Sequence, residues 1–382
     1  MNVLRLLVLF LLALSRARGD ALDRWELRNS TTNSALKAIA YANGTYVVAG
    51  VRELIINSTD GITWTSTNFG AHNSFYALAR GNNRFVAVGH EFSDPCPAFV
   101  SFDGTNWVGY DMGIGGGIFN GITFGNGKFV AVAGSGIILT SPTGSNWTWQ
   151  TSGTSQTLQG IGFGNGLFVA AGDRVILTSP DAINWSVQSH PEFGGSGYAL
   201  IYTNGFFWLT CDYGIIRRSS DGFSWTNVVN LGSYDLRAIT FGNGTYVAVG
   251  GGAPVYCMLL TSTNGIEWRQ RIVWLQQFGT MYPNGIVFAN NKFTVVCENG
   301  IIVESADVRI PSLVSESWGA TNGTSVAVSG GVGYRYLLQG NTNLSNTNWT
   351  DLGRVTNDLP TVLFQDLSST NLPQRFYRAL GP

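Results

Sequence analysis

An asparagine turn and a tryptophan recur together along this chain. The turns, Asn-Gly or Asn-Asn, are spaced by 39, 44, 39, 39, 39 and 47 residues and begin at Asn43, Asn82, Asn126, Asn165, Asn204, Asn243 and Asn290. One tryptophan lies between each two consecutive turns, at Trp64, Trp107, Trp147, Trp185, Trp225 and Trp268. None follows Asn290 at that distance, but Trp25 lies 18 residues before Asn43, as Trp64 does before Asn82. The repeat therefore occurs seven times, and Trp25 completes the last one.

Each repeat is predicted to fold as four short antiparallel strands. In the first repeat, residues 36–41 and 46–50 flank the turn at Asn43-Gly44, residues 54–57 form a third strand, and Trp64 lies in a fourth. Asn-Gly favours the positive φ angles of a type I′ hairpin turn. The second strands, such as residues 129–132, are nearly continuous apolar runs, which is typical of strands covered on both faces.

Four strands in about 40 residues is the period of a propeller blade. One such unit cannot bury both of its faces alone, so neighbouring units must stack around an axis. We therefore predict an all-β chain with a seven-bladed β-propeller over residues 22–308. Residues 25–28 would supply the outer strand of the last blade and so close the ring, which leaves no open sheet edge.

A second motif precedes the tryptophan of each repeat. It reads Ser58-Thr59-Asp60-Gly61, Ser101-Phe102-Asp103-Gly104 and Ser220-Asp221-Gly222, with departures at Thr143, Ala182 and Asn264. The motif resembles the Asp-box (BNR) repeats of sialidase-superfamily propellers and of the photosystem II assembly-factor type, over residues 22–308. The side chains of such a box have structural duties: the aspartate accepts backbone N–H groups within the turn, and the tryptophan fills the space between blades.

The N-terminus, residues 1–21, has the features of a signal peptide. Arg5 provides a basic start, Leu6 to Leu14 form a nine-residue apolar core, and small residues follow at Ala17, Gly19 and Ala21. Nine apolar residues are too few to span a bilayer. We therefore expect no membrane span, and a mature protein that is secreted, periplasmic or attached to the cell surface.

The repeat ends near residue 308, and residues 309–382 are predicted to form a small C-terminal β domain. Alternating runs such as residues 334–339 and 361–364 indicate the strands of a β-sandwich-like module. The stretch from Tyr336 to Trp349, with the ending at residues 374–378, resembles a C-terminal accessory module of exported bacterial proteins. That resemblance implies surface retention or sorting. A cap that stabilises the propeller is the alternative.

Composition excludes several classes of partner. With a net charge of −1 and 12% charged residues, the chain has no concentrated basic face, so we expect no nucleic-acid partner. His72 and His90 with Glu91 lack the spacing of metal ligands. We expect no metal, no cofactor and a monomer. Disulfides are permitted in an exported protein, but no pairing follows for the four cysteines, Cys96, Cys211, Cys257 and Cys297.

One face of the expected propeller gathers the candidate binding residues. If the strands of each blade run outward from the axis, the links between blades and the turns between second and third strands share a face, together with the insertions at 90–98 and 251–256. Binding function concentrates in loops at one rim of a rigid scaffold. The candidates on this rim are His72, His90, Glu91, Asp94, Tyr110, Asp111, Asp173, His190, Asp212, Trp274 and Glu298.

No catalytic set is apparent in the sequence. Glycoside hydrolysis needs two carboxyl groups about 5–10 Å apart, and a sialidase would need three arginines for its carboxylate substrate. Arg80 and Arg237 lie on predicted innermost strands, without a matching third. We therefore predict an exported, non-catalytic propeller that binds protein or glycan through the rim. Two alternatives stay open: a sialidase-like glycoside hydrolase, and an assembly factor for an envelope complex.

Overall fold

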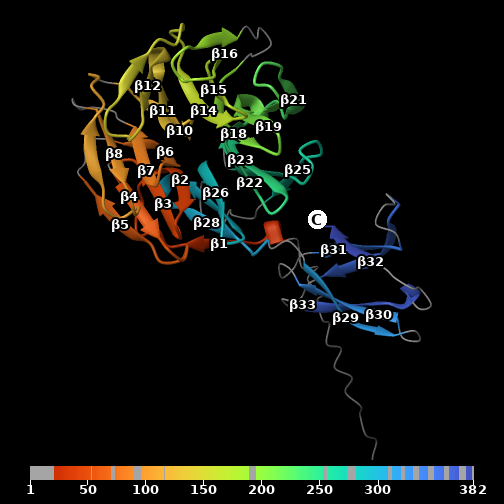
Figure 1. Cartoon of the computed structure of the whole chain (residues 1–382). Helices are drawn as coiled ribbons and strands as arrows, with labels where there is room; N and C mark the ends of the chain where they lie inside the picture. The colour runs from red at the N-terminus through yellow and green to blue at the C-terminus, as the bar shows by residue number, and fades with distance from the viewer. Residues whose placement is uncertain are drawn as a thin grey trace, which may run out of the picture. The chain divides into compact units, whose positions relative to one another are not determined.

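The chain folds into β-strands joined by turns and a few short 3₁₀ helices (Figure 1). A computed structural model describes residues 21–52, 54–69, 74–89, 96–115, 117–188, 195–252, 256–272, 281–308, 312–319, 323–329, 335–342, 348–356, 361–369 and 376–380. The chain divides into two compact units, one of them Asp23–Ile310 and the other comprising Pro311–Pro382. Within the described residues, no helix is long and apolar enough to cross a membrane.

The Asp23–Ile310 unit contains seven four-stranded antiparallel sheets among its described residues. In six of them the strands follow one another in space as they do in sequence, from innermost to outermost. The first three are β2 (Leu36–Ala42), β3 (Thr45–Gly50), β4 (Leu54–Ser58) and β5 (Thr65–Asn68); β6 (Phe75–Gly81), β7 (Arg84–Gly89), β8 (Pro97–Ser101) and β9 (Val108–Asp111); β10 (Phe119–Gly125), β11 (Lys128–Ala133), β12 (Ile138–Ser141) and β13 (Thr148–Gln150). The next three are β14 (Leu158–Gly164), β15 (Leu167–Gly172), β16 (Val175–Ser179) and β17 (Ser186–Gln188); β18 (Gly197–Thr203), β19 (Phe206–Cys211), β20 (Ile216–Ser219) and β21 (Thr226–Val229); β22 (Asp235–Gly242), β23 (Thr245–Gly252), β24 (Tyr256–Ser262) and β25 (Arg269–Ile272).

The seventh sheet joins the two ends of the repeat region. It comprises β26 (Pro283–Ala289), β27 (Lys292–Cys297), β28 (Ile302–Ser305) and, as its outermost strand, β1 (Trp25–Arg28). Trp25 pairs with Ser305 and Arg28 with Ile302. The prediction that residues 25–28 complete the last sheet is therefore confirmed.

The hairpin turns adopt the backbone that the asparagines predict. The first turn residue has φ between 43° and 52° in all seven repeats, and the second residue is also left-handed, with Asn83 and Asn291 taking the place of glycine. Two positive φ angles define the type I′ turn, whose twist matches that of the flanking strands. This turn fixes the register of the first two strands of every sheet.

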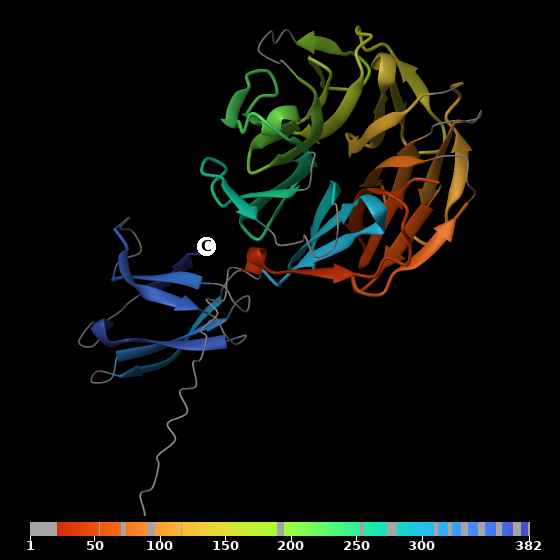
Figure 2. The same cartoon turned by 180° about the vertical axis from the view of Figure 1, so that it is seen from behind.

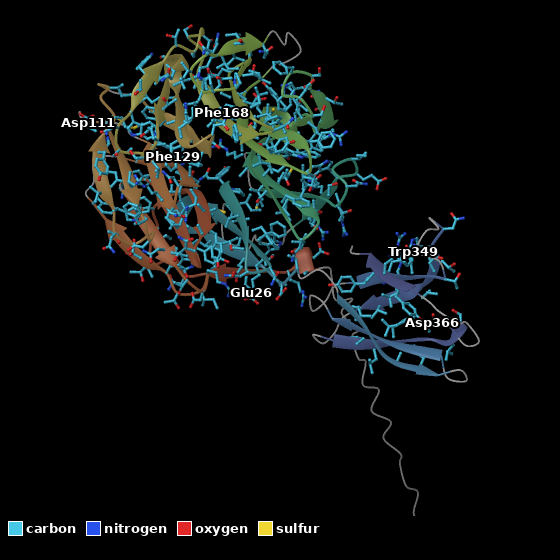
Figure 3. The ribbon with its side chains drawn as sticks, viewed as in Figure 1. Glu26, Asp111, Phe129, Phe168, Trp349 and Asp366 are labelled. Atoms are coloured by element: carbon cyan, nitrogen blue, oxygen red, sulfur yellow. The ribbon has the colours of Figure 1, made fainter. Side chains whose placement is uncertain are left out.

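The innermost strands form a closed series (Figure 2). Each of β2, β6, β10, β14, β18 and β22 contacts the next, β22 contacts β26, and β26 contacts β2. The core consists of residues sandwiched between neighbouring sheets, such as Phe129 and Phe168, which are fully buried inside the unit (Figure 3). Full burial of such a side chain stabilises the fold by about 1.5–3 kcal/mol.

The repeat tryptophans belong to these inter-sheet cores, as predicted. Trp64 is 4% exposed and packs with residues of its own sheet and of the seventh. Trp107, Trp147, Trp185 and Trp225 contact equivalent clusters between consecutive sheets. Each tryptophan thus contributes to the attachment of one sheet to the preceding one.

The box turns also have the expected structural role. Asp60 Oδ1 accepts the backbone N–H groups of Ile62 and Thr63 at 2.8 and 2.7 Å, and Trp64 Nε1 donates to the Gly61 carbonyl at 3.1 Å. In the fifth sheet the serine of the box is Ser219, whose Oγ accepts the Gly222 N–H at 2.8 Å, and not Ser220 as the sequence suggested. The box of the fifth sheet therefore begins at Ser219, one residue before the start suggested by the sequence, because the serine hydroxyl must accept the backbone N–H of the residue three positions later.

The Pro311–Pro382 unit contains two three-stranded antiparallel sheets among its described residues. One has the order β29 (Ser312–Gly319), β30 (Gly323–Ser329) and β33 (Thr361–Asp366), and the other β32 (Thr350–Thr356), β31 (Arg335–Asn341) and β34 (Phe376–Leu380). The sheets contact each other through β29 with β34 and through β32 with β33. Across both units, the part of the chain that the structure describes contains five 3₁₀ segments: η1 (Ala21–Asp23), η2 (Gly134–Gly136), η3 (Asp212–Gly214), η5 (Glu298–Gly300) and η6 (Leu367–Ser369).

Candidate functional site

Every innermost strand carries a β-bulge near its start. In β2, Leu36 pairs with Gly50 and Ala38 with Ala49, which leaves Lys37 between two paired residues. The same shift recurs in all seven sheets. The seven bulged residues, hereafter the bulge ring, are Lys37, Tyr76, Asn120, Gln159, Tyr198, Arg237 and Asn284.

The bulge ring lies on the face that carries the links between sheets, because each bulge is the second or third residue of an innermost strand. A bulge redirects a side chain and interrupts pairing, and such features concentrate next to functional sites. All seven bulged residues are polar, charged or tyrosine, although they sit between apolar and small neighbours. The fold therefore assembles seven hydrogen-bonding side chains, one from each sheet, at one level of the ring of innermost strands.

A small residue follows each bulge because the neighbouring sheet passes close to it. A methyl group on Gly160 would lie 2.4 Å from the carbonyl oxygen of Tyr198, and one on Gly121 would lie 2.8 Å from that of Gln159. Both distances are too short for a carbon atom, so only glycine fits. The backbone of one bulge thus rests on the residue after the preceding bulge.

Several bulge side chains reach across to the next sheet. Asn120 Nδ2 donates to the Leu158 carbonyl at 2.9 Å, and Asn284 Nδ2 donates to the Leu36 carbonyl at 2.8 Å. Lys37 Nζ donates to Glu298 Oε1 at 2.6 Å across the junction between the first and seventh sheets. Asn284 Nδ2 also lies 2.9 Å from Glu298 Oε1. These bonds fix the ring side chains on the scaffold.

The fourth, fifth and sixth sheets contribute an acidic sector to the ring. Asp173 and Asp212 follow the second strands of two adjacent sheets and meet at Ser196, whose Oγ donates to Asp173 Oδ1 at 2.6 Å and whose N–H donates to Asp212 Oδ2 at 2.9 Å. Tyr198 OH donates to Asp235 Oδ2 at 3.3 Å. Three carboxylates therefore gather around the start of β18.

One arginine of the bulge ring stands in this sector. Arg237 Nη2 lies 3.5 Å from Asp235 Oδ2, with side-chain exposures of 44% and 33%, and its guanidinium carbon lies 5.7 Å from the centre of the Tyr198 ring. The pair is too exposed to contribute much to stability. Its guanidinium is instead available to a ligand.

The ionised form of Asp212 is electrostatically unfavourable in the folded protein. Burial raises its pKa above the usual value, the hydrogen bond from the Ser196 N–H opposes this rise, and the charges of Asp235 and Asp173 add to it. Its carboxylate lies against Gly195, where a methyl group would be 1.9 Å from Oδ1. The positive charge of Arg217 lowers this pKa, but burial and the two neighbouring carboxylates outweigh it.

The structure distributes the sequence-predicted rim residues unevenly. Asp173, Asp212 and Glu298 all follow second strands and contact the bulge ring or its sector. Tyr110 and Asp111 lie on β9, the outermost strand of the second sheet, with Asp111 at the outer edge of the unit (Figure 3). The structure thus brings Asp173 and Asp212 together at Ser196, whereas Glu298 lies at the junction of the first and seventh sheets and Tyr110 and Asp111 lie elsewhere. Outside the described residues lie His72, His90, Glu91, Asp94, His190 and Trp274.

The sequence prediction missed the bulge ring, apart from a mention of Arg237. A signal for it exists: in each repeat a polar residue or tyrosine stands directly before alanine or glycine, six residues before the turn asparagine. Lys37-Ala38, Gln159-Gly160 and Asn284-Gly285 are examples. Among the described residues, no group of three or more His, Cys, Asp or Glu side chains is arranged to hold a metal ion.

Solved structures of similar fold exist at low sequence identity. YCF48 bound to D1 peptide is 18% identical, with a TM-score of 0.59, over 75% of this chain and 97% of that one. A catalytically inactive virginiamycin B lyase from Staphylococcus aureus with quinupristin is 13% identical, with a TM-score of 0.64, over 74% and 99%. The WD40 β-propeller domain of Doa1 is 10% identical, with a TM-score of 0.56, over 74% and 97%. No protein-family model and no curated protein matches the chain. The repeated four-stranded sheets therefore have the β-propeller fold.

Proposed function

We propose that this chain is an exported, non-catalytic β-propeller of seven blades, with a small C-terminal β-sandwich domain, that binds a segment of another protein at the bulge ring. One observation carries the proposal: each of the seven sheets presents a polar, charged or tyrosine side chain at the same level of one face. Amide, phenol and guanidinium groups arranged in this way match the alternating donors and acceptors of a peptide backbone.

The acidic sector favours a segment with a basic side chain. The carboxylates of Asp173, Asp212 and Asp235 outnumber the guanidinium groups of Arg217 and Arg237 there. The raised pKa of Asp212, caused first by burial, indicates that a further cation nearby would be favourable. An ammonium or guanidinium group from the ligand would supply it. The likeness to a propeller crystallised with a peptide supports this mode of binding, although that likeness extends only to the fold.

The test is selection of binders from a random peptide library, followed by measurement of affinity for the selected peptide. We expect Arg237→Gln and Tyr198→Phe to weaken binding, and Asp212→Asn to weaken it most for peptides with a basic residue. Lys128→Gln is the matched control. It removes a cation at the start of β11, next to the Asn126-Gly127 turn at the other end of the strands from the bulge ring. Binding that is equally sensitive to Lys128→Gln, or insensitive to the ring variants, would exclude the ring as the site.

Glycoside hydrolysis is a second candidate, because one specific arrangement favours it. Asp212, with its pKa raised by burial, lies in the same sector as Asp235, which accepts a hydrogen bond from Tyr198. Two carboxyl groups held in different environments are the arrangement that glycosidases use. Release of 4-methylumbelliferone from aryl glycosides by the wild-type protein, and its loss in Asp212→Asn, would establish this activity in place of simple binding.

The assembly-factor alternative is a special case of peptide binding. In that case the captured segment belongs to a subunit that has not yet joined its envelope complex, and the propeller releases it on assembly. Export by residues 1–21 would place the protein in the periplasm, at the cell surface or outside the cell. Fractionation of cells, with N-terminal sequencing of the mature chain, tests this part of the proposal.

A further inference from the structure

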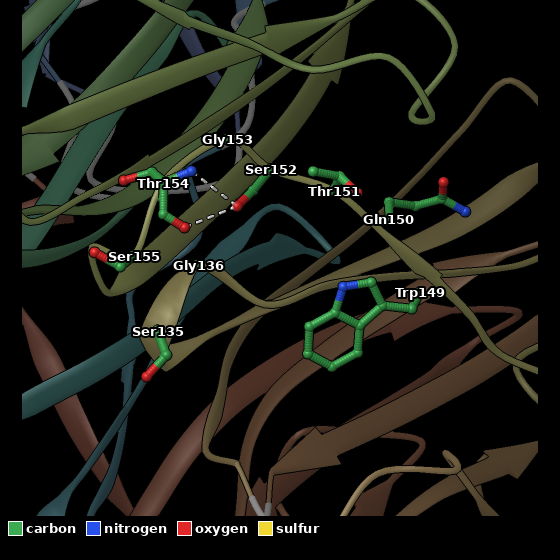
Figure 4. A pocket seen from close by; sticks show the side chains of 9 residues that line it. All are labelled: Ser135, Gly136, Trp149, Gln150, Thr151, Ser152, Gly153, Thr154 and Ser155. Carbon is green, nitrogen blue, oxygen red and sulfur yellow. Dashed lines mark hydrogen bonds between the residues drawn. The ribbon is translucent and has the colours of Figure 1, made fainter.

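A pocket lies beside the outermost strand of the third sheet, and none of the seven bulged residues lines it (Figure 4). The pocket measures ≈ 420 Å³ and is formed by β13, the loop at residues 151–155 and the turn at η2. Its volume falls within the range of about 300–1,000 Å³ that small-molecule sites occupy. The residues that supply its chemistry are Ser135, Trp149, Gln150, Thr151, Ser152 and Thr154.

Trp149 forms an exposed aromatic wall of this pocket. Its side chain is 55% exposed, whereas Trp64 is buried and the other repeat tryptophans are partly buried. The residue at the same position of the neighbouring sheet, Val187, and Leu27 in the seventh sheet are aliphatic. Because the other sheets fold without an aromatic side chain at this position, the scaffold does not need the indole of Trp149 for packing.

The rest of the pocket is polar and uncharged. None of its nine lining residues is acidic or basic. Within the described residues, the hydroxyl groups of Ser135, Thr151 and Ser155 form no hydrogen bond inside the protein, so they are available to a ligand. Gln150 donates from Nε2 to Thr140 Oγ1 at 2.9 Å, which fixes its amide while its carbonyl oxygen can still accept.

The walls of the pocket are held in place before any ligand binds. Ser152 Oγ donates to the Thr154 carbonyl at 3.1 Å and accepts the Thr154 N–H at 3.3 Å (Figure 4). Gly136, with φ of +70°, lies directly beneath the Thr154 carbonyl, since a methyl group there would be 2.0 Å from that oxygen. A preformed site loses little conformational entropy on binding.

The same corner occurs without the tryptophan in the seventh sheet. Ser30 Oγ donates to the Thr32 carbonyl at 3.1 Å, and Gly300 lies under the Thr32 carbonyl as Gly136 does under that of Thr154. The loop geometry is therefore part of the scaffold. What distinguishes the third sheet is the combination of Trp149 with free hydroxyl groups.

We propose that this pocket binds a neutral sugar ring stacked on Trp149, with the hydroxyl and amide groups around it hydrogen-bonding to the sugar hydroxyls. An aromatic face suits the apolar C–H face of a pyranose, and the surrounding groups are both donors and acceptors, as a sugar requires. The absence of charge from the lining excludes a carboxylated or sulfated sugar as the preferred ligand, because such groups are recognised by arginine or lysine. This site extends the proposed binding role to a second kind of ligand and does not depend on the bulge ring.

The test is affinity electrophoresis of the full chain through gels that contain xylan, laminarin, a soluble mannan or hydroxyethyl cellulose. We expect at least one of these neutral polysaccharides to retard the wild-type protein. Trp149→Ala should weaken the association roughly tenfold or more, and Gln150→Ala by a smaller factor. Phe223→Ala, which removes another exposed aromatic side chain from the box turn of the fifth sheet, should leave the mobility unchanged.

Three outcomes would overturn this proposal. The wild-type protein shows no retardation with any of the four polymers; or Trp149→Ala binds as tightly as wild type while its melting temperature is unchanged; or a proline-rich peptide, and no sugar, occupies the pocket. Retention of sugar binding in Arg237→Gln, with loss of peptide binding, would separate this site from the bulge ring. Failure of either site therefore leaves the other testable.

Discussion

Arg28 donates from Nη2 to Glu304 Oε2 at 2.6 Å and from Nε to the same oxygen at 3.1 Å, across 276 residues of sequence. Glu304 is 1% exposed, and its Oε2 also accepts from Lys292 Nζ at 2.9 Å. The N-terminal strand β1 is thus fastened to the seventh sheet by a buried charge as well as by backbone pairing. Ring closure is therefore supported by a buried carboxylate that pairs with two cations, one of them on β1.

We predict that Arg28→Met destabilises the propeller by about 2–3 kcal/mol. The cost should be smaller than for a buried carboxylate that loses its only partner, because Lys292 still pairs with Glu304. The melting temperature should fall by several degrees. Glu26→Gln is the control: Glu26 also pairs with Arg28, at 2.8 Å, but is 70% exposed and should contribute little. Deletion of residues 22–30 should have a far larger effect than either, and an unchanged melting temperature for that deletion would refute closure by β1.

The box aspartates should make the melting temperature of the protein depend on pH in the acidic range. The backbone N–H groups of Thr63 and Ile62, with the Ser58 hydroxyl, lower the pKa of Asp60 to about 2. Because the folded-state pKa lies below the unfolded value of about 3.9, the contribution is present above that value and is lost as pH falls towards 2. Asp60→Asn should therefore reduce the loss of melting temperature between about pH 4 and pH 2.

The chain provides a natural reference for that experiment. Asn264 occupies the same position in the sixth sheet and accepts the N–H groups of Ile266 and Glu267, each at 2.9 Å. An asparagine can therefore fold the turn at neutral pH, and Asn264→Asp should increase sensitivity to acid. If Asp60→Asn and wild type lose stability in parallel between pH 4 and pH 2, the box hydrogen bonds do not lower the pKa as described.

The glycine of the box is replaceable only where space allows. A methyl group on Gly265 would lie 2.3 Å from the Trp208 ring, and its φ is +70°. We expect Gly265→Ala to cost about 2 kcal/mol or more, through backbone strain and overpacking. Ala182 already stands at this position in the fourth sheet, at φ of 62°. Ala182→Gly should be neutral within about 1 kcal/mol, since relief of strain offsets the lost methyl contact.

Chemical denaturation followed by tryptophan fluorescence measures both substitutions. The two results together separate strain from packing: a large cost for Gly265→Ala alone assigns the effect to Trp208. Equal and small effects would show that the neighbouring sheet moves away, and that the inter-sheet spacing is less rigid than the contacts imply.

Buried thiols give a further check of the fold. Burial raises the pKa of Cys96, Cys211 and Cys257 to about 12, and that of Cys297 well above its usual value. Thiol reagents attack the thiolate, so at pH 8 the folded protein should react far more slowly than the unfolded chain. Ellman's reagent, applied with and without guanidinium chloride, measures this difference. Rapid reaction of native Cys211 would contradict its placement at the buried end of β19.

The repeat could be predicted from sequence because its signals are local. An Asn-Gly turn sets its own φ angles, and Trp25 has a fixed distance to the next turn, so the addition of residues 25–28 to the last sheet followed from counting. Contacts between side chains of different sheets have no such local signal in the sequence. The meeting of Asp173 and Asp212 at Ser196 depends on how two sheets pack, and no spacing in the sequence encodes it.

The bulge ring was hidden for a different reason. A bulge inserts one residue into a strand, so Lys37 or Gln159 looks like an ordinary position in an alternating pattern. Only the alignment of all seven repeats on the small residue that follows would reveal it. Trp149 was overlooked because the partly buried Trp147, two residues earlier, already accounted for the tryptophan of that repeat.

Asp212 should respond to substitution in the opposite sense to Asp60. Burial raises its pKa, and the charges of Asp235 and Asp173 add to the rise, so the ionised form is less stable in the folded protein than in the unfolded chain. Asp212→Asn should therefore raise the melting temperature at pH 7, because an amide oxygen can still accept the Ser196 N–H. The gain should vanish as pH falls below the unfolded value of about 3.9, where the wild-type carboxyl is protonated in both states. Thermal unfolding from pH 7 to pH 3 measures this, and a lower melting temperature for Asp212→Asn at pH 7 would contradict it. A variant that gains stability while losing affinity for the selected peptide would mark Asp212 as a residue retained for binding at the expense of stability.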